Sequence, residues 1–392
     1  MPFLKYLFFL SALFCTANIS SQEFPVMAFH GVPEQFTNKA SFRFLKESGI
    51  NINFTVYTSN AEAQKALDCA QEAGVKILLF TPELVHSTAA TVRRFKNHPA
   101  LFGYYVRDEP SAAEFGEVSA KIKEIKKTDP LHPTYIILFP NYAENSLLKA
   151  KSYDHYLGLY ISSVPVDFIS FDNYPLMNDV IHKDWYANLE SVRNASLRAK
   201  KEFWGFANAT IFRTYRQPTL AGLRLQIFSN LLYGAQGIQY FTYWTLDDEY
   251  WRKNNFGKSM VDPKGLPTPT YHLVKSVNSQ VRHYARLFQG SRVTSVFHTD
   301  VMRPAQTRKL PYQMRSMKNF RTGGSAIVSY FSNKGSDYVA ILNKDLYKDI
   351  SITFDSTAPI SILDSRAVEK RLETGSRVRS TIGAGDILIL KF

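Results

Sequence analysis

The sequence predicts a (β/α)8 barrel followed by a small antiparallel β-sandwich. Eight short apolar, β-rich runs alternate with helix-period segments between residues 24 and 248. No glycine-rich phosphate loop follows the first run, which favours a closed barrel over an open doubly wound sheet. After residue 286 the helical segments stop, and short alternating strands with polar turns follow.

The eight predicted barrel strands are FPVMAFH (24–30), NINFTVYT (51–58), VKILLFT (75–81), ALFGYYVRDEP (100–110), TYIILFP (134–140), VDFISFDNYP (166–175), FWGFANA (203–209) and GIQYFTYWTLDD (237–248). Two of the helical segments between them close with the glycine expected after a helix. The later runs SAIVSYFSN, DYVAILNKD, DISITFD, APISILD and DILILKF predict the sandwich. We therefore expect a signal peptide at 1–21, a barrel at 22–285 and an accessory sandwich at 286–392.

The first residues have the layout of a secretory signal peptide. Lys5 precedes an apolar run from Tyr6 to Phe14, and small polar residues follow. We expect export to the periplasm or the extracellular space. Cys15 is not expected to carry a lipid anchor, because Phe14 is larger than the residue that normally precedes a lipid-modified cysteine. No later stretch reaches the ~20 apolar residues of a transmembrane helix.

Composition narrows the range of partners. The formal net charge is +13, but the basic residues are scattered, without a basic helix, a zinc-ligand set or an aromatic RNA-binding motif. We therefore expect no nucleic-acid partner; the charge belongs either to a solvated surface or to a site for an anionic glycan. Beyond the signal segment Cys69 stands alone, so no internal disulfide is expected. We expect a monomer without a metal or a cofactor.

The fourth predicted strand ends in three charged residues. Reactive groups of a parallel barrel collect where its strands end. Counting by twos, Arg107 and Glu109 share the inward face, and Asp108 takes the opposite face unless a bulge turns it. The alternative is an ion pair at the start of the next helix.

A second carboxylate was sought because glycosidic bond hydrolysis uses a pair of carboxyl groups. Asp172 ends the apolar run of the sixth strand, whereas Asp167 lies at the start of that strand. Asp247 and Asp248 follow the eighth strand and are further candidates.

These residues resemble the barrel glycoside hydrolases of clan A, and more closely bacterial members in which DEP ends the fourth strand. The resemblance spans the barrel through GYYVRDEPS, DFISFDNYP, the segment from FWGFANA to GAQGIQYFTYW, and the trailing sandwich. It implies that Glu109 is the general acid/base. The sequence departs from the pattern at Asp108, where an asparagine is usual, and at Asn208, where a nucleophilic glutamate is expected.

We expect an exported glycoside hydrolase that cleaves an oligo- or polysaccharide, with Glu109 as general acid and Asp172 as base or nucleophile, and three readings of its action remain open. Asp172 is the base of an inverting enzyme, or Asp108 orients a substrate acetamido group that attacks within its own molecule, or the protein binds glycans without cutting them. The first reading predicts about 6.5–9.5 Å between the carboxyl groups of Glu109 and Asp172. It also places Asn208 at the cleft as a hydrogen-bond donor to the sugar.

The other strand ends supply candidate substrate-binding side chains, since tyrosine and tryptophan can stack on a sugar ring. The predicted set is Arg107, His30, Tyr57, Tyr142, Tyr174, Asn208, Tyr243, Trp244 and Asp247.

Overall fold

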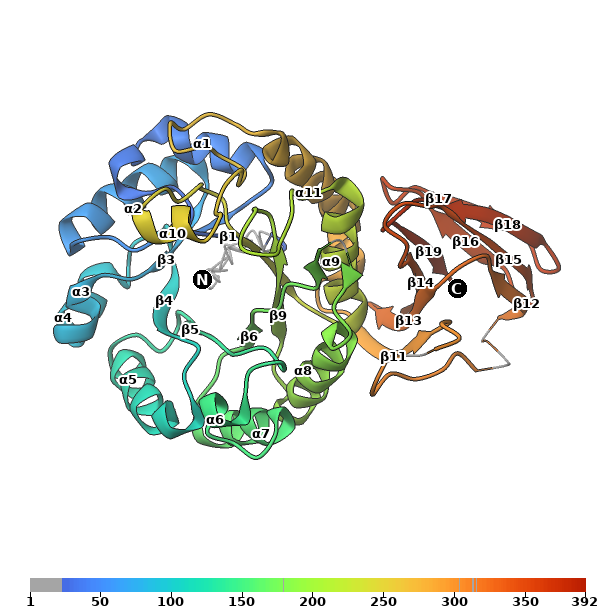
Figure 1. The fold of residues 1–392 in the computed structure, drawn as a ribbon, viewed down its shortest axis with the longest axis horizontal. Coiled ribbons are helices and arrows are strands. Elements are labelled where there is room, and N and C mark those ends of the chain that lie inside the picture. Colours follow the sequence, from blue (N-terminus) through green and yellow to red (C-terminus); the bar gives the residue numbers. More distant parts are fainter. Residues whose placement is uncertain (1–22, 179, 303, 312–313, 315) are drawn as a thin grey trace, which may run out of the picture.

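In the computed structural model, which describes residues 23–392 except 179, 303, 312, 313 and 315, the chain forms a (β/α)8 barrel followed by a β-sandwich (Figure 1). Each of the eight predicted barrel runs contains a strand, and the predicted fold class is confirmed. The barrel strands are β1 (Val26–Phe29), β2 (Ile52–Phe54), β3 (Lys76–Leu79), β4 (Leu101–Asp108), β5 (Thr134–Ile137), β6 (Ile169–Phe171), β9 (Phe203–Asn208) and β10 (Gly237–Phe241).

All neighbouring barrel strands run parallel, in the order β5-β4-β3-β2-β1-β10-β9-β6. A single bridge between Leu138 and Phe171 joins the two ends of this order and closes the barrel. Closure is short at this point because β5 and β6 are only four and three residues long. The ends of β4, β5 and β6 therefore lie next to one another at the mouth.

Helices surround the strands, as Figure 1 shows. Side-chain caps fix where several of them begin: Ser59, Ser152 and Thr219 accept hydrogen bonds from backbone N–H groups in the first turn. The helices are α1 (Lys39–Glu47), α2 (Asn60–Ala73), α3 (Pro82–His86), α4 (Thr88–Phe95), α5 (Phe115–Thr128), α6 (Asn145–Leu148), α7 (Tyr153–Ser163), α8 (Trp185–Ala199), α9 (Leu220–Tyr233), α10 (Glu249–Lys253) and α11 (Pro269–Phe288), with short 3-10 turns at Glu34–Phe36 and Ala112–Glu114 and a small hairpin of β7 (Leu176–Met177) and β8 (Val180–Ile181).

Strand alternation separates two apolar layers. Inward-facing side chains fill the barrel, and most of them are aromatic or large aliphatic residues. Outward-facing side chains pack against the helices in a second, larger core. The interior set is Met27, Phe29, Ile52, Phe54, Leu78, Tyr105, Tyr135, Ile137, Tyr174, Trp204 and Phe206.

The C-terminal part forms a sandwich of two antiparallel sheets around its own core. The larger sheet has the order β11-β13-β14-β19-β16-β17 and the smaller one β12-β15-β18. Their strands are β11 (Arg292–His298), β12 (Met317–Thr322), β13 (Ala326–Asn333), β14 (Ser336–Asn343), β15 (Ile350–Ser356), β16 (Ile360–Leu363), β17 (Glu369–Leu372), β18 (Arg377–Ile382) and β19 (Ile387–Lys391).

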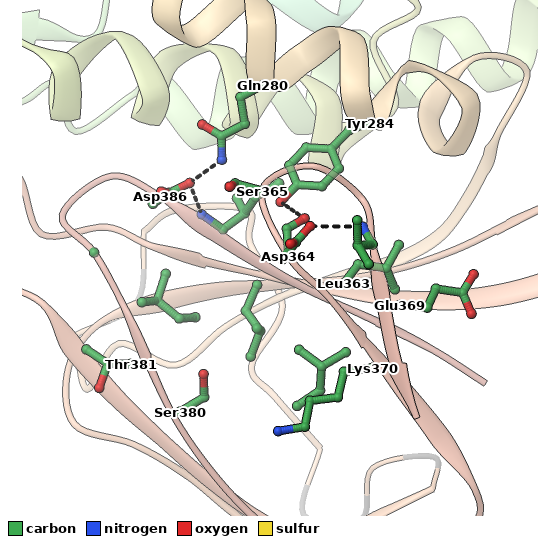
Figure 2. A pocket seen from close by; sticks show the side chains of 16 residues that line it. Gln280, Tyr284, Leu363, Asp364, Ser365, Glu369, Lys370, Ser380, Thr381 and Asp386 are labelled. Carbon is green, nitrogen blue, oxygen red and sulfur yellow. Dashed lines mark hydrogen bonds between the residues drawn. The ribbon is translucent and has the colours of Figure 1, made fainter. Parts of the chain in front are cut away.

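The sandwich packs on the barrel beside α9 and α11 (Figure 1). Figure 2 shows part of this contact, where Gln280 of α11 donates a hydrogen bond of 2.8 Å to Asp386 and the Tyr284 hydroxyl donates one of 3.0 Å to the carbonyl of Asp364. Phe331 of β13, in the larger sheet, stacks on Phe288 of α11, with ring centroids 5.2 Å apart. Apolar and polar contacts thus join the two parts.

The signal peptide at 1–21, with Cys15, lies outside the described residues, and the domain boundary near residue 285 falls within α11. Among the described residues, no helix combines the length and apolar character needed to cross a membrane.

Candidate active site at the barrel mouth

A bulge in β4 decides which of its charged residues face the barrel. Tyr105 pairs with Tyr135 of β5, but the next register pair is Arg107 with Ile136, so Val106 is the extra residue. Asp108 then pairs with Ile137, which belongs to the barrel interior. The bulge therefore turns Asp108 toward the mouth and Arg107 away from it.

Arg107 does not face inward, contrary to the prediction from strict alternation along the strand. Its guanidinium forms ion pairs with Glu114 at 3.0 Å and Glu117 at 3.5 Å, on the turn and helix that follow β4. This matches the alternative of an ion pair at the start of the next helix. Because Arg107 points outward, we do not assign it to substrate binding.

The backbone brings Glu109 and Asp172 to the same strand end. The N–H of Glu109 donates to the carbonyl of Ile137 at 2.9 Å, and the N–H of Asp172 donates to the carbonyl of Leu138 at 3.3 Å. Glu109 has a φ of 41°, in the left-handed region that non-glycine residues seldom adopt. Two consecutive residues at the end of β5 thus anchor both carboxyl-bearing residues.

The carboxyl groups of Glu109 and Asp172 form a hydrogen bond with each other. Burial raises the pKa of Asp172 well above its usual range, and the negative charges of Glu109 and Asp108 raise it further. Burial and Asp108 also raise the pKa of Glu109, to about 7, while the hydrogen bond from Asp172 opposes this rise. Asp172 therefore keeps its proton to higher pH than Glu109 does, and it is the donor in the hydrogen bond between them.

This contact corrects the expected separation of about 6.5–9.5 Å between the two carboxyl groups. Groups joined by a hydrogen bond leave no room for a water molecule between them. The separation is shorter because β5 ends early and the backbones of both residues bond to consecutive residues at its end, Ile137 and Leu138.

Asp108 completes a group of three carboxyls. Burial raises its pKa, and a hydrogen bond with Tyr105 partly offsets that rise. Asp108 is the solvent-exposed member of the group, whereas Glu109 and Asp172 are half-buried. The Oδ1 atom of Asp172 is fully buried and has no hydrogen-bond partner within the described structure. Asp108 also lines a cavity of about 350 Å³ between β4, α3 and α5.

Tyrosines form one side of the mouth beside Asp172. The Tyr142 and Tyr215 hydroxyls lie beside each other, and burial raises the pKa of both. The ring of Tyr215 lies 5.7 Å from that of Tyr174, which in turn lies 5.2 Å from Phe241. Tyr174 is buried and Tyr142 is exposed, so the wall extends from the interior to the surface.

Sequence reasoning missed Tyr105 and Tyr215. A contact between Tyr105 and Asp108 was not expected, because the position of a bulge cannot be read from the sequence. Tyr215 lies in the loop after β9, in the segment FRTYRQ. The signal in the sequence that could have indicated Tyr215 is an aromatic residue in the loop that follows a barrel strand.

His30 lies at the mouth after β1, also in a left-handed conformation with φ of 46°. Its ring packs edge-on against Phe29, Phe241 and Trp251 at 4.8, 6.1 and 5.9 Å. Burial lowers the pKa of His30 to about 4, and the charge of Asp248 only partly offsets this. His30 is therefore neutral at pH 7.

Three predicted stacking residues do not line the mouth. Tyr57, Tyr243 and Trp244 are almost completely buried in the core between strands and helices. Tyr57 accepts a hydrogen bond from Asn53 at 3.3 Å, and Trp244 packs on Phe36 with ring centroids 4.6 Å apart. Each lies past the end of its strand, where the chain folds back onto the helices, so position in sequence did not predict exposure.

Asn208 and Asp247 differ in their surroundings. The Asn208 amide donates to the carbonyl of Thr210 at 3.0 Å and accepts from its N–H at 3.3 Å, and the residue is buried. The expectation of a sugar-binding donor is corrected, because this amide holds the local turn. Asp247 is exposed in the loop before α10. Across the described part of the chain, no group of three His, Cys, Asp or Glu residues is placed to hold a metal ion.

No protein-family model matches the sequence, and no curated protein does either. Solved structures do match. A family 42 β-galactosidase from G. stearothermophilus has a TM-score of 0.61 at 8% identity, covering 95% of this chain and 98% of the enzyme. A family 39 glycoside hydrolase from Bacteroides cellulosilyticus has a TM-score of 0.56 at 10% identity, and the match covers 94% of this chain and 80% of that enzyme.

The β-galactosidase from Marinomonas ef1 has a TM-score of 0.50 at 10% identity, and the match covers 67% of this chain but only 60% of that enzyme. The chain has the fold of these glycoside hydrolases. At such low identities the likeness shows the fold alone, and activity must be argued from the carboxyl groups at the mouth.

Proposed function

We propose that the protein is an exported glycoside hydrolase in which Glu109 is the general acid. The observation that supports this most directly is the hydrogen-bonded pair of Glu109 and Asp172 at the barrel mouth, beside the exposed Asp108. A general acid works best when its pKa lies near the working pH, and that of Glu109 is raised to about 7.

In the proposed reaction Glu109 gives its proton to the glycosidic oxygen as the bond between that oxygen and the anomeric carbon breaks. Water supplies the hydroxyl group of the new sugar end, and the remaining proton returns to Glu109. Asp172 is a positioning residue, because a carboxyl that holds its proton at neutral pH neither attacks a sugar nor activates water. Its hydrogen bond aims Glu109 and keeps the pKa of Glu109 from rising further.

Asp108 is the candidate for the second catalytic carboxyl. It has the greatest solvent access of the three, and the hydrogen bond with Tyr105 favours its charged form. Asp108 and Glu109 both lie at the end of β4, and the charge of Asp108 acts on Glu109, so the two carboxyl groups are close together. This arrangement favours the substrate-assisted reading, in which Asp108 orients an acetamido group that attacks the anomeric carbon.

The decisive experiment varies the leaving group. Glu109→Gln should cut turnover of natural oligosaccharides by about 10²–10⁴-fold, because the sugar leaving group then departs without a proton. Dinitrophenyl glycosides, whose leaving group needs no proton, should lose far less. Glu117→Gln is the matched control, since Glu117 is an exposed carboxylate that pairs with Arg107 on the outer side.

Equal loss on both substrate types would show that Glu109 is not the acid. Binding of oligosaccharides without any turnover by the wild-type protein would support the noncatalytic alternative. For the substrate-assisted reading, turnover should require an N-acetylated sugar, and matched glycosides without the acetyl group should be inert.

A further inference from the structure

We propose that Tyr347, in the C-terminal sandwich, forms a distal sugar-binding subsite that extends the barrel's active site. The ligand would be a pyranose ring of a glycan chain, one or more units away from the cleaved bond. This inference rests on the proposed glycosidase function and adds a residue from the second part of the chain to substrate recognition.

The first observation is an exposed aromatic side chain on a rigid loop. Tyr347 is 74% exposed. Its N–H and that of Lys348 both donate to the Asp345 carboxylate, at 2.8 and 2.9 Å. The fully buried Asn343 amide donates to the carbonyl of Lys348 and to two further carbonyls from Ile382 and Gly383. A large ring held on such a loop can bind a ligand with little loss of backbone entropy.

The loop is also fixed to the barrel. Gly385 donates its N–H to the carbonyl of Asp345 at 2.9 Å. A Cβ atom at Gly385 would lie 2.2 Å from the carbonyl oxygen of Ala221, in the first turn of α9, so the sandwich backbone touches this helix directly. An ion pair of 3.2 Å between Arg224 and Asp386 adds to the contact. The start of α9 lies at the end of the barrel where β9 ends, which is the end that carries the carboxyl groups.

The second observation is a cavity shared by the two parts of the chain. It measures about 150 Å³ and is lined by Leu346 and Tyr347 from the sandwich and by Leu176, Asn208 and Arg216 from the barrel. Asn208 pairs with Phe241, whose ring packs against Tyr174 beside Asp172. The cavity therefore lies at the end of the barrel where β9 ends, between the β9–α9 loop and the sandwich.

Consecutive residues of the β9–α9 loop connect the barrel mouth with the cavity beside Tyr347. Tyr215 faces the mouth, where its ring lies 5.7 Å from that of Tyr174. Arg216 lines the cavity under Tyr347. A glycan chain that extends from the active site along this loop would reach the ring of Tyr347. That ring offers an apolar face to the sugar and a hydroxyl group to the polar edge of the sugar.

The experiment uses the full-length chain with Glu109→Gln to prevent cleavage, and measures binding of cello-, xylo-, manno-, galacto- and N-acetylchito-oligosaccharides of increasing length. In the series that binds, affinity should rise with chain length. Adding Tyr347→Ala should abolish the gain from the distal units, a loss of roughly 2- to 12-fold, and leave the shortest ligand unaffected. Tyr347→Trp should retain the gain because it preserves the stacking surface.

Leu131→Ala is the control, since Leu131 is another highly exposed apolar residue, located in the loop between α5 and β5. A length-dependent gain that survives Tyr347→Ala would overturn the subsite, and so would an equal loss for short and long ligands. Failure of the wild-type protein to cleave any of these series, with no binding by the variants, would instead contradict the proposed function.

Discussion

The protonated carboxyl group of Asp172 donates a hydrogen bond to the carboxyl group of Glu109, although strand β5 lies between their strands. The contact exists because both backbones bond to the last residues of β5, one to Ile137 and the other to Leu138. Two adjacent carboxyl groups cannot both ionise easily, so Asp172 keeps its proton at neutral pH and Glu109 loses its own only near pH 7. The following expectations depend on where that proton resides.

Activity should fall as pH rises through about 7. A general acid must carry its proton, and the pKa of Glu109 is raised from 4.5 to about 7. The alkaline limb of kcat/KM should therefore decline about tenfold per pH unit above that value. Residual turnover of a dinitrophenyl glycoside by Glu109→Gln should lack this limb. A limb that persists in the variant would assign it to another group.

Replacement of Asp172 should separate a positioning role from a role as base. Asp172→Asn keeps a donor to Glu109 and should retain activity within about tenfold, because the native carboxyl is already neutral. Asp172→Ala removes the donor, so the alkaline limb of activity should shift to higher pH as the pKa of Glu109 rises. Loss of about 10³-fold or more in Asp172→Asn would show instead that Asp172 is the base or nucleophile.

The raised pKa of Glu109 also predicts a change in stability. The folded state binds the proton more tightly than the unfolded state, so the charge of Glu109 costs no stability below pH 4.5 and its full cost above about pH 7. Glu109→Gln should therefore gain stability relative to the wild type as pH rises between these values, by about 1–2 kcal/mol after solvent screening. Denaturant unfolding at pH 4.5 and 8 measures the difference, and a pH-independent gain would contradict it.

The contact between barrel and sandwich contains a buried ion pair that should be sensitive to single substitutions. The Lys344 ammonium lies 2.7 Å from Asp300 and 4.5 Å from the ring centroid of Tyr186 on α8. Burial raises the pKa of Asp300, but hydrogen bonds from His298 and Lys344 outweigh this effect and lower it overall. Its stabilising effect is therefore present at neutral pH and is lost as pH falls below 3.8.

Asp300→Asn should cost about 3–5 kcal/mol of unfolding free energy, because it leaves the Lys344 charge buried without a carboxylate. The double variant, in which Lys344→Met is added to Asp300→Asn, should recover most of the lost unfolding free energy. Thermal unfolding of the two variants and the wild type at pH 7 provides the comparison, and no recovery in the double variant would show that packing, not charge, is decisive.

Sequence reasoning identified both carboxyl residues at the correct strand ends, because parallel strands of a barrel all end at one face and Glu109 and Asp172 close two apolar runs. It could not orient Asp108 and Arg107. One extra residue in β4 exchanges the two faces, and a bulge depends on how neighbouring strands pair.

The sequence by itself determined the alternation of strands and helices, the change to a sandwich, and the position of each acidic residue along its strand, since these follow from local periodicity. Only the tertiary structure decided the hydrogen bond between Glu109 and Asp172, the burial of Tyr57 and Trp244, and the cavity that Tyr347 shares with Asn208 and Arg216. Those features arise from contacts between segments far apart in the chain, and their geometry is set by how short strands close the barrel and how the sandwich packs on α9.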